Sequence, residues 1–215
     1  MSKAQGRSLE LFFIDGKPDG MLTAEVFNWT GHVLMTPRVQ LSEALQRTEA
    51  VYTGVYLLLG EQDGQPMAYI GEGENISRRI KNHDLQKDWW TTVILVTSAA
   101  NNLHKAHVQY LEARLIEEAR TISRIHLENA NTPSRPSLSE SAKANMEAFL
   151  DYLLMVLPAL RVDMFLKNIR PTAGQHAFAE ATKPSPTFEL TLKKEAIHAI
   201  AKLTGGEFVV QANSM

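Results

Sequence analysis

The chain has 215 residues, of which 44% are hydrophobic and 21% charged, and its formal net charge is −2. This composition is typical of a globular protein with enough apolar residues for a core, and no apolar run approaches the ~20 residues that span a bilayer. The absence of cysteine excludes disulfides and thiolate metal sites. Because the chain has no excess of basic residues, we do not expect an extensive nucleic-acid-binding surface. A small catalytic groove with a few local cations is still compatible with this net charge.

The N-terminus has no apolar segment followed by a small-residue cleavage site, so no signal peptide is expected. We therefore expect a cytoplasmic protein that does not contact a membrane. The first fifty residues predict β-structure, with strands at 8–14, 21–30 and 32–37 separated by turn residues. A short helix is expected to start at Ser42.

The next segment combines a predicted hairpin, a helix, a strand and a long helix. Strand-forming residues at 51–59 are followed by an Asp-Gly turn and a returning strand at 67–71. Asn75 is a capping residue for a helix that follows the hairpin. A third strand is expected at 91–98, and apolar residues at helical spacing predict a long helix over 102–120.

The remainder of the chain begins with a predicted helix at 138–157, which Pro158 limits. Residues 168–187 are rich in Pro, Thr and Ala and are interpreted as a linker. The last segment is interpreted as a strand, a helix over 194–203 and a second strand. Because these are too few elements for a core of their own, we interpret 188–215 as the start of an incomplete domain.

Several polar residues of the central segment are candidates for a site. Tyr56 and Tyr69 lie on strands joined by the hairpin, so their hydroxyls can approach the same end of the sheet. Taken alone, two strand tyrosines are more simply explained by sheet packing. Arg79 lies eight residues after Gly71 in the predicted helix, and His83 shares its face. A helix N-terminus followed by a guanidinium suits a phosphate, and a solvated helix face is the alternative.

Glu112 is the most informative single residue. It lies one turn from Val108 and one turn from Ile116, inside the apolar stripe of the predicted long helix. Glutamate is seldom buried without a partner. The position therefore indicates a cation, a metal or a proton-sharing group nearby, and a side chain that reaches solvent from the edge of the stripe is the alternative.

The order of these residues resembles the GIY-YIG nuclease family. Gly-Val-Tyr at 54–56 is followed by Tyr-Ile-Gly at 69–71, by Arg79 and, after a third strand, by Glu112 on a helix. Only the valine of the first tripeptide departs from the family pattern, and the resemblance covers about residues 50–132. It implies an α+β fold with a small mixed or antiparallel sheet flanked by helices. It also implies cleavage of a phosphodiester bond with one divalent ion.

The resemblance implies a role for each matching residue. One of Tyr56 and Tyr69, assisted by His83, would help to deprotonate the attacking water. Arg79 would steady the scissile phosphate, and Glu112 would hold the metal ion, Mg²⁺ or Mn²⁺. The expected substrate-binding residues are Gly71, Arg78, Lys81, Asn129 and Asn131. Because a tyrosine with an ordinary pKa near ~10 is a poor base at neutral pH, this hypothesis requires a neighbour that lowers its pKa.

Two of these assignments, those of the glycine and of the asparagine, follow from particular positions in the family pattern. The glycine of the second tripeptide, Gly71, is expected to let backbone and substrate come close because it has no side chain. Asn129 and Asn131 both qualify as the asparagine that follows the long helix in the family, and the sequence does not separate them.

Residues 12–38 and 101–119 are also similar to a bacterial GIY-YIG subfamily whose members carry a C-terminal domain of unknown function after a linker. Residues 187–192 and 205–210 resemble the start of that domain. We therefore expect an N-terminal β extension packed on the core, a nuclease domain, a helical extension, a linker and an incomplete further domain. The corresponding boundaries are 1–49, 50–132, 133–167, 168–187 and 188–215.

The leading functional hypothesis is a metal-dependent endonuclease that acts on DNA. A nucleic-acid-binding module that keeps the fold with little catalysis is an alternative. An inactive descendant is expected to lose at least one of four residues that are all present here, namely Tyr56, Tyr69, Arg79 and Glu112. A protein-interaction scaffold is a third reading, in which Trp29 and the pair Trp89 and Trp90 are exposed.

Overall fold

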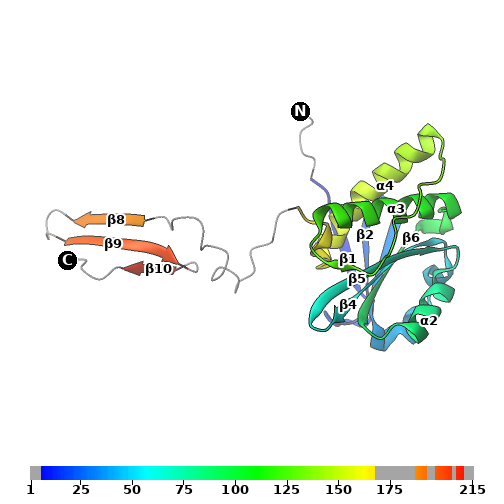
Figure 1. Cartoon of the computed structure of the whole chain (residues 1–215), viewed down its shortest axis with the longest axis horizontal. Helices are drawn as coiled ribbons and strands as arrows, with labels where there is room; N and C mark the ends of the chain where they lie inside the picture. The colour runs from blue at the N-terminus through cyan, green and yellow to red at the C-terminus, as the bar shows by residue number, and fades with distance from the viewer. Residues whose placement is uncertain (1–5, 168–186, 193–196, 205–206, 211–215) are drawn as a thin grey trace. The chain divides into compact units, whose positions relative to one another are not determined.

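The computed structural model describes residues 6–167, 187–192, 197–204 and 207–210 (Figure 1). The chain divides into two compact units, Met1–Lys167 and Asn168–Met215. In the described parts of the chain, no helix combines the length and the apolar character needed to cross a membrane.

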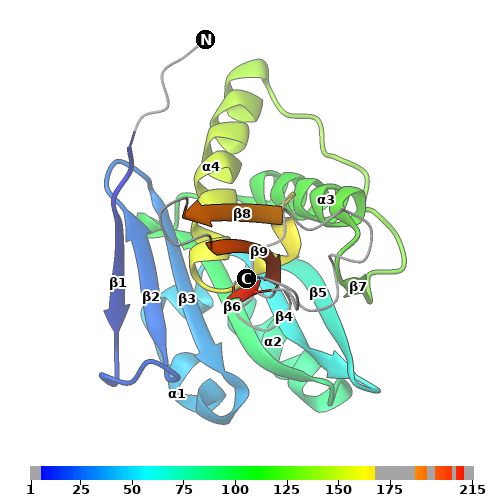
Figure 2. The same ribbon diagram turned by 90° about the vertical axis from the view of Figure 1, so that its left-hand side faces the viewer.

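The first unit is built on one seven-stranded sheet with the strand order β1-β2-β3-β6-β4-β5-β7 (Figure 2). The strands are β1 (Leu9–Phe13), β2 (Leu22–Val26), β3 (Gly31–Pro37), β4 (Gly54–Gln62), β5 (Gln65–Gly73), β6 (Trp90–Ser98) and β7 (His126–Leu127). Neighbouring strands are antiparallel except for β5 and β7, which are parallel. The sheet is therefore mixed, and the expected α+β class is confirmed.

Four α-helices accompany the sheet: α1 (Leu41–Ala44), α2 (Ile76–Gln86), α3 (Lys105–Ile122) and α4 (Glu140–Ala159). Short 3-10 helices, named η1 (Arg38–Gln40), η2 (Thr48–Val51), η3 (Ala99–Asn101) and η4 (Asp163–Phe165), connect the larger elements. Helices α3 and α4 cover one face of the sheet and α2 lies on the other (Figure 1).

Alternate side chains of β4 are buried in two different apolar clusters, one on each face of the sheet. Val55 and Leu57 point to the α3 and α4 side, whereas Tyr56 and Leu58 belong to the apolar cluster that includes α2. Because side chains of a strand alternate between faces, a strand that is buried on both sides needs a nearly continuous apolar run. The run at the start of β4 meets this requirement and places one tyrosine on the α2 side.

The N-terminal strands are not a separate layer. Strand β3 pairs with β6 along its whole length, from Gly31 opposite Ser98 to Pro37 opposite Thr92. The segment expected as an extension packed on the core is therefore continuous with the central sheet, which is larger than the small sheet that the sequence predicted. Strand β6 consequently has strands on both sides, β3 and β4.

The helices of the first unit begin and pack largely as expected. The side chain of Asn75 accepts a hydrogen bond from the backbone N–H of Arg78 at 3.0 Å, which confirms the predicted cap of α2. The apolar stripe of α3, which includes Val108, Leu111 and Ile116, is fully buried. This stripe packs against the face of the sheet that carries Val55 and Leu57.

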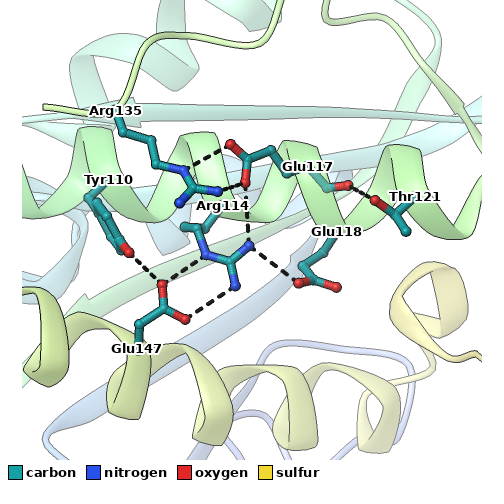
Figure 3. A network of polar contacts seen from close by, with 7 residues as sticks. All are labelled: Tyr110, Arg114, Glu117, Glu118, Thr121, Arg135 and Glu147. Carbon is teal, nitrogen blue, oxygen red and sulfur yellow. Dashed lines mark hydrogen bonds and ion pairs between the residues drawn. The ribbon is translucent and has the colours of Figure 1, made fainter.

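A polar network joins α3 to α4 (Figure 3). Arg114 of α3 donates from Nε and Nη2 to the two carboxylate oxygens of Glu147 of α4, at 2.8 and 3.2 Å. The hydroxyl of Tyr110 donates to the same carboxylate at 2.5 Å. Glu117 pairs with Arg114 and also with Arg135 from the segment between the two helices. The network fixes α4 on α3 with charged hydrogen bonds at the rim of the apolar contact.

The second unit corrects one prediction. The helix expected over 194–203 is wrong, because β9 (Ile197–Thr204) is a strand between β8 (Thr187–Leu192) and β10 (Glu207–Val210), antiparallel to both. Apolar residues occupy every second position from 197 to 203, and the flanking strands supply backbone partners that outweigh local helix propensity. Apart from Thr187, the expected linker lies outside the described residues.

Candidate active site

Three rings form a cluster on the α2 side of the hairpin made by β4 and β5. Tyr56 of β4 lies opposite Gly71, and Tyr69 of β5 lies opposite Leu58, so both tyrosines share one face. The Tyr56 hydroxyl lies 2.8 Å from Nε2 of His83 on α2. The ring centroid of Tyr69 is 4.9 Å from that of His83 and 6.2 Å from that of Tyr56.

Two glycines of β5 make room for two of the candidate side chains. A Cβ on Gly71 would lie 2.4 Å from the Tyr56 hydroxyl oxygen, so the tyrosine ring covers this glycine. A Cβ on Gly73 would lie 2.8 Å from Cγ of Arg79. Gly71 therefore makes room for the ring of Tyr56, which occupies the space that the sequence argument assigned to substrate.

Burial controls the protonation of both tyrosines. Burial, followed by the charge of Tyr69, raises the pKa of Tyr56 well above its ordinary value, although the charge and hydrogen bonding of Arg79 act in the opposite direction. Burial and then the charge of Glu112 raise the pKa of Tyr69. The requirement for a lowered tyrosine pKa is not met in the unliganded chain, so both hydroxyls carry their protons at neutral pH.

His83 is neutral for the same reason. Burial, then the charges of Lys87 and Arg79, lowers its pKa to about 4. A neutral imidazole can accept a hydrogen bond at Nε2, and we therefore assign Tyr56 as the donor. The other ring nitrogen, Nδ1, is buried without a hydrogen-bond partner in the described part of the chain.

The C-terminal end of α2, which carries His83, is held by a side chain from the N-terminal part of the chain. Arg38 of η1 donates from Nε to the carboxylate of Asp84 at 2.8 Å and from Nη2 to the Asp84 carbonyl oxygen at 2.9 Å. Its guanidinium carbon also lies 4.4 Å from the ring centroid of Trp90. Forked donors and ring stacking restrain the helix end more tightly than one hydrogen bond would.

Lys87 is a second restraint near His83. Its ammonium lies 5.0 Å from the ring centroid of Tyr69 and forms an ion pair with Glu128 beyond β7. The indole of Trp89 donates to the same carboxylate at 3.3 Å. The position of Lys87 explains why its charge is the largest electrostatic cause of the low His83 pKa, after burial.

Glu112 approaches the same end of β5 from the opposite face of the sheet. Strand β7 pairs with β5 only at Met67 and Ala68, so the C-terminal half of β5 lies at the edge of the sheet. Burial, then the charge of Glu72, raises the pKa of Glu112 to about 7, and Arg79 acts in the opposite direction. Glu112 is thus half-buried, and charged groups on both faces of the sheet affect its pKa.

The carboxylates fit an open, hydrated metal site. In the ranges that the structure describes, no group of three or more His, Asp or Glu residues is arranged to enclose a metal ion. However, the charge of Glu72 raises the pKa of Glu112, and one oxygen of Glu72 is buried with no hydrogen-bond partner in the described segments. Mg²⁺ usually keeps several waters and binds through one or two carboxylates together with substrate phosphate. These residues are therefore suited to such an ion.

The two candidate asparagines differ clearly. The side chain of Asn129 accepts from the backbone N–H of Ile70 at 2.9 Å and donates to the Ile70 carbonyl oxygen at 2.7 Å. It continues the pairing of β7 along β5 and thereby anchors the loop that carries Glu128. Asn131 is exposed, as are Arg78 and Lys81 on α2. The structure thus brings Asn129 into contact with the β5 edge and leaves the other three residues exposed.

Two residues near Glu112 were missed by the sequence argument. Glu72 is a charged residue between Gly71 and Gly73 in a strand, which is a signal that the sequence offered. Lys105 forms an ion pair with Glu72 at 2.6 Å. It lies two turns before Glu112 on the same face of α3.

The tryptophans do not support an exposed docking surface. Trp89 and Trp90 are 9% and 1% exposed. Trp29 is half-buried and stacks on Tyr152 with ring centroids 6.0 Å apart. The premise of the interaction-scaffold hypothesis, that these three side chains are exposed, is therefore wrong.

Comparisons of the chain with protein-family profiles, curated proteins and solved structures find no match.

Proposed function

We infer that this chain is a metal-dependent endonuclease of the GIY-YIG type that hydrolyses phosphodiester bonds in DNA. The observation that carries this proposal is the convergence of Tyr56, Tyr69, Arg79, His83 and Glu112 at one end of β5. These residues come from two strands and two helices. They are linked by a hydrogen bond, by ring contacts and by mutual effects on their pKa values.

Arg79 supplies the group that would bind the scissile phosphate. Its side chain lies across Gly73, and the residue is exposed to solvent. A forked guanidinium can donate two hydrogen bonds to non-bridging phosphate oxygens and stabilise the charge that grows on them in the transition state. A divalent ion on Glu112 would supply Lewis-acid stabilisation of the phosphate and the leaving oxygen.

Tyr56 and His83 supply a path for the proton of the attacking water. Because the pKa of Tyr56 is raised, a free tyrosinate is not available at neutral pH. Neutral His83 already accepts the Tyr56 hydrogen bond. The water can therefore transfer a proton to the tyrosine oxygen while the tyrosine proton moves to Nε2 of His83, so that no isolated tyrosinate forms. Bound phosphate would favour this step, since its negative charge raises the pKa of His83.

The test is a nicking assay on supercoiled plasmid and on branched DNA, with Mg²⁺ or Mn²⁺, and with RNA of matched sequence as a second substrate. Arg79→Ala and Glu112→Gln should each lower the rate by about 10²-fold or more. Arg161→Ala is the matched control, because Arg161 is an exposed arginine that follows α4 and is not among the candidate site residues. Nicking that survives in both active-site variants would refute the proposal. No nicking by the parent chain would favour the binding-module alternative.

A further inference from the structure

Only one of the two carboxylate oxygens of Glu72 has a hydrogen-bond partner among the described residues. Its side chain is 13% exposed, and its Oε1 accepts from Nζ of Lys105 at 2.6 Å. Its Oε2 is buried and has no partner among the residues that the structure describes. Removing an ionised oxygen from water is costly unless a donor or a cation replaces the lost solvation. The free oxygen therefore marks a place where a cation would be stabilised.

The geometry of α3 brings this oxygen into relation with Glu112. Lys105, Val108 and Glu112 lie at positions i, i+3 and i+7, which share one face of a helix. Val108 is fully buried in the core cluster that contains Ile70 of β5. Because Lys105 contacts Glu72 of the same strand, this face of α3 lies along β5. Glu112 follows on that face, and Glu72 is the charged group that most affects it.

We propose that Glu72 is a second carboxylate ligand of the divalent cation expected at Glu112, and that Lys105 is the counter-charge that holds Glu72 when the cation is absent. The inference rests on the metal site of the proposed function and adds a ligand to it. Two carboxylates completed by water are a usual set for Mg²⁺ or Mn²⁺. The ammonium of Lys105 and the cation then compete for the same carboxylate.

The experiment measures binding of Mn²⁺ and of Mg²⁺ to the full chain by titration calorimetry, without nucleic acid. Glu72→Gln should raise Kd by about tenfold or more, as expected for a lost metal contact, and Glu112→Gln should have at least the same effect. Glu74→Gln is the matched control, because Glu74 is an exposed glutamate two residues away. Lys105→Met should lower Kd, since it removes the competing cation and leaves both carboxylates. Circular dichroism melting of each variant verifies that the fold is kept.

The outcomes distinguish the role of Glu72 as an additional ligand from the existence of the metal site at Glu112. If Glu72→Gln binds the ion like the parent and Glu112→Gln does not, the additional ligand is refuted and the metal site of the proposed function stands. A Kd that rises in Lys105→Met would overturn the competition, because Lys105 would then support the ion. Absence of saturable binding in the parent chain would remove the metal site and the inference together.

Discussion

The neutral state of His83 leads to a prediction about stability that does not depend on the proposed activity. The native pKa is about 4, whereas the unfolded chain has the ordinary value of about 6.5. Because the native state binds fewer protons between these values, the free energy of unfolding falls as the pH is lowered from about 6.5 to about 4. Above about 6.5 both states are neutral at this residue, and the contribution is fully present.

The magnitude follows from the same two values. The difference corresponds to an upper limit of roughly 3 kcal/mol. Since the ring is only half-buried, screening by solvent reduces the effect, and we expect about 1–2 kcal/mol. His83→Gln removes the titrating group and keeps an acceptor for the hydroxyl of Tyr56. The stability of this variant should therefore depend less on pH in this range than the stability of the parent chain.

The assay is urea denaturation of the parent and His83→Gln chains at several pH values between about pH 4 and pH 7. Carboxylates titrate in both chains, so the difference between the two curves isolates His83. Nuclear magnetic resonance of the imidazole gives its pKa directly, and Lys87→Met should move that pKa upward because a repelling charge is removed. An imidazole that titrates near its ordinary pKa in the parent chain would refute the reasoning from burial.

Three further variants test packing and hydrogen bonding by urea denaturation. Gly71→Ala should destabilise the fold by about 1–3 kcal/mol and move the ring of Tyr56, because the added Cβ would lie 2.4 Å from that ring; unchanged ring signals would contradict this. Glu147→Ala should cost about 1–2 kcal/mol, since it removes both bonds from Arg114 at a partly exposed position, and a change near zero would show that solvent replaces them. Asn129→Ala should cost about 1–3 kcal/mol because it breaks two bonds to the backbone of β5. Asn131→Ala, at an exposed asparagine, should leave the stability unchanged, and equal losses of stability in the two variants would refute this account.

Features that depend on near neighbours in the chain were predictable from sequence. The cap at Asn75 uses a donor three residues away, and the buried stripe of α3 follows from spacing within one helix. Features that depend on distant segments were not. Whether β9 is a strand depends on β8 and β10, and whether the N-terminal strands join the sheet depends on the pairing of β3 with β6. Local propensity carries no information about such partners.

The candidate site shows the same division. The spacing of Tyr56, Tyr69 and Arg79 is visible in the sequence, but the sequence does not show that the Tyr56 ring occupies the space above Gly71. The choice between the asparagines was open because the bonds of Asn129 are made to Ile70, 59 residues away in the chain. Protonation states were also beyond reach, since they depend on burial, which only the assembled fold defines.

Burial is the leading cause of the shifted pKa in Tyr56, His83 and Glu112 alike. Each of these groups is therefore held toward its uncharged form in the free chain. An anionic phosphate would favour a proton on His83, and a divalent cation would favour the carboxylate of Glu112. For the proposed endonuclease, bound phosphate would make neutral His83 a better proton acceptor, and a bound cation would keep Glu112 ionised. Both ligands would thus oppose the effect of burial, which holds His83 and Glu112 toward their uncharged forms in the free chain.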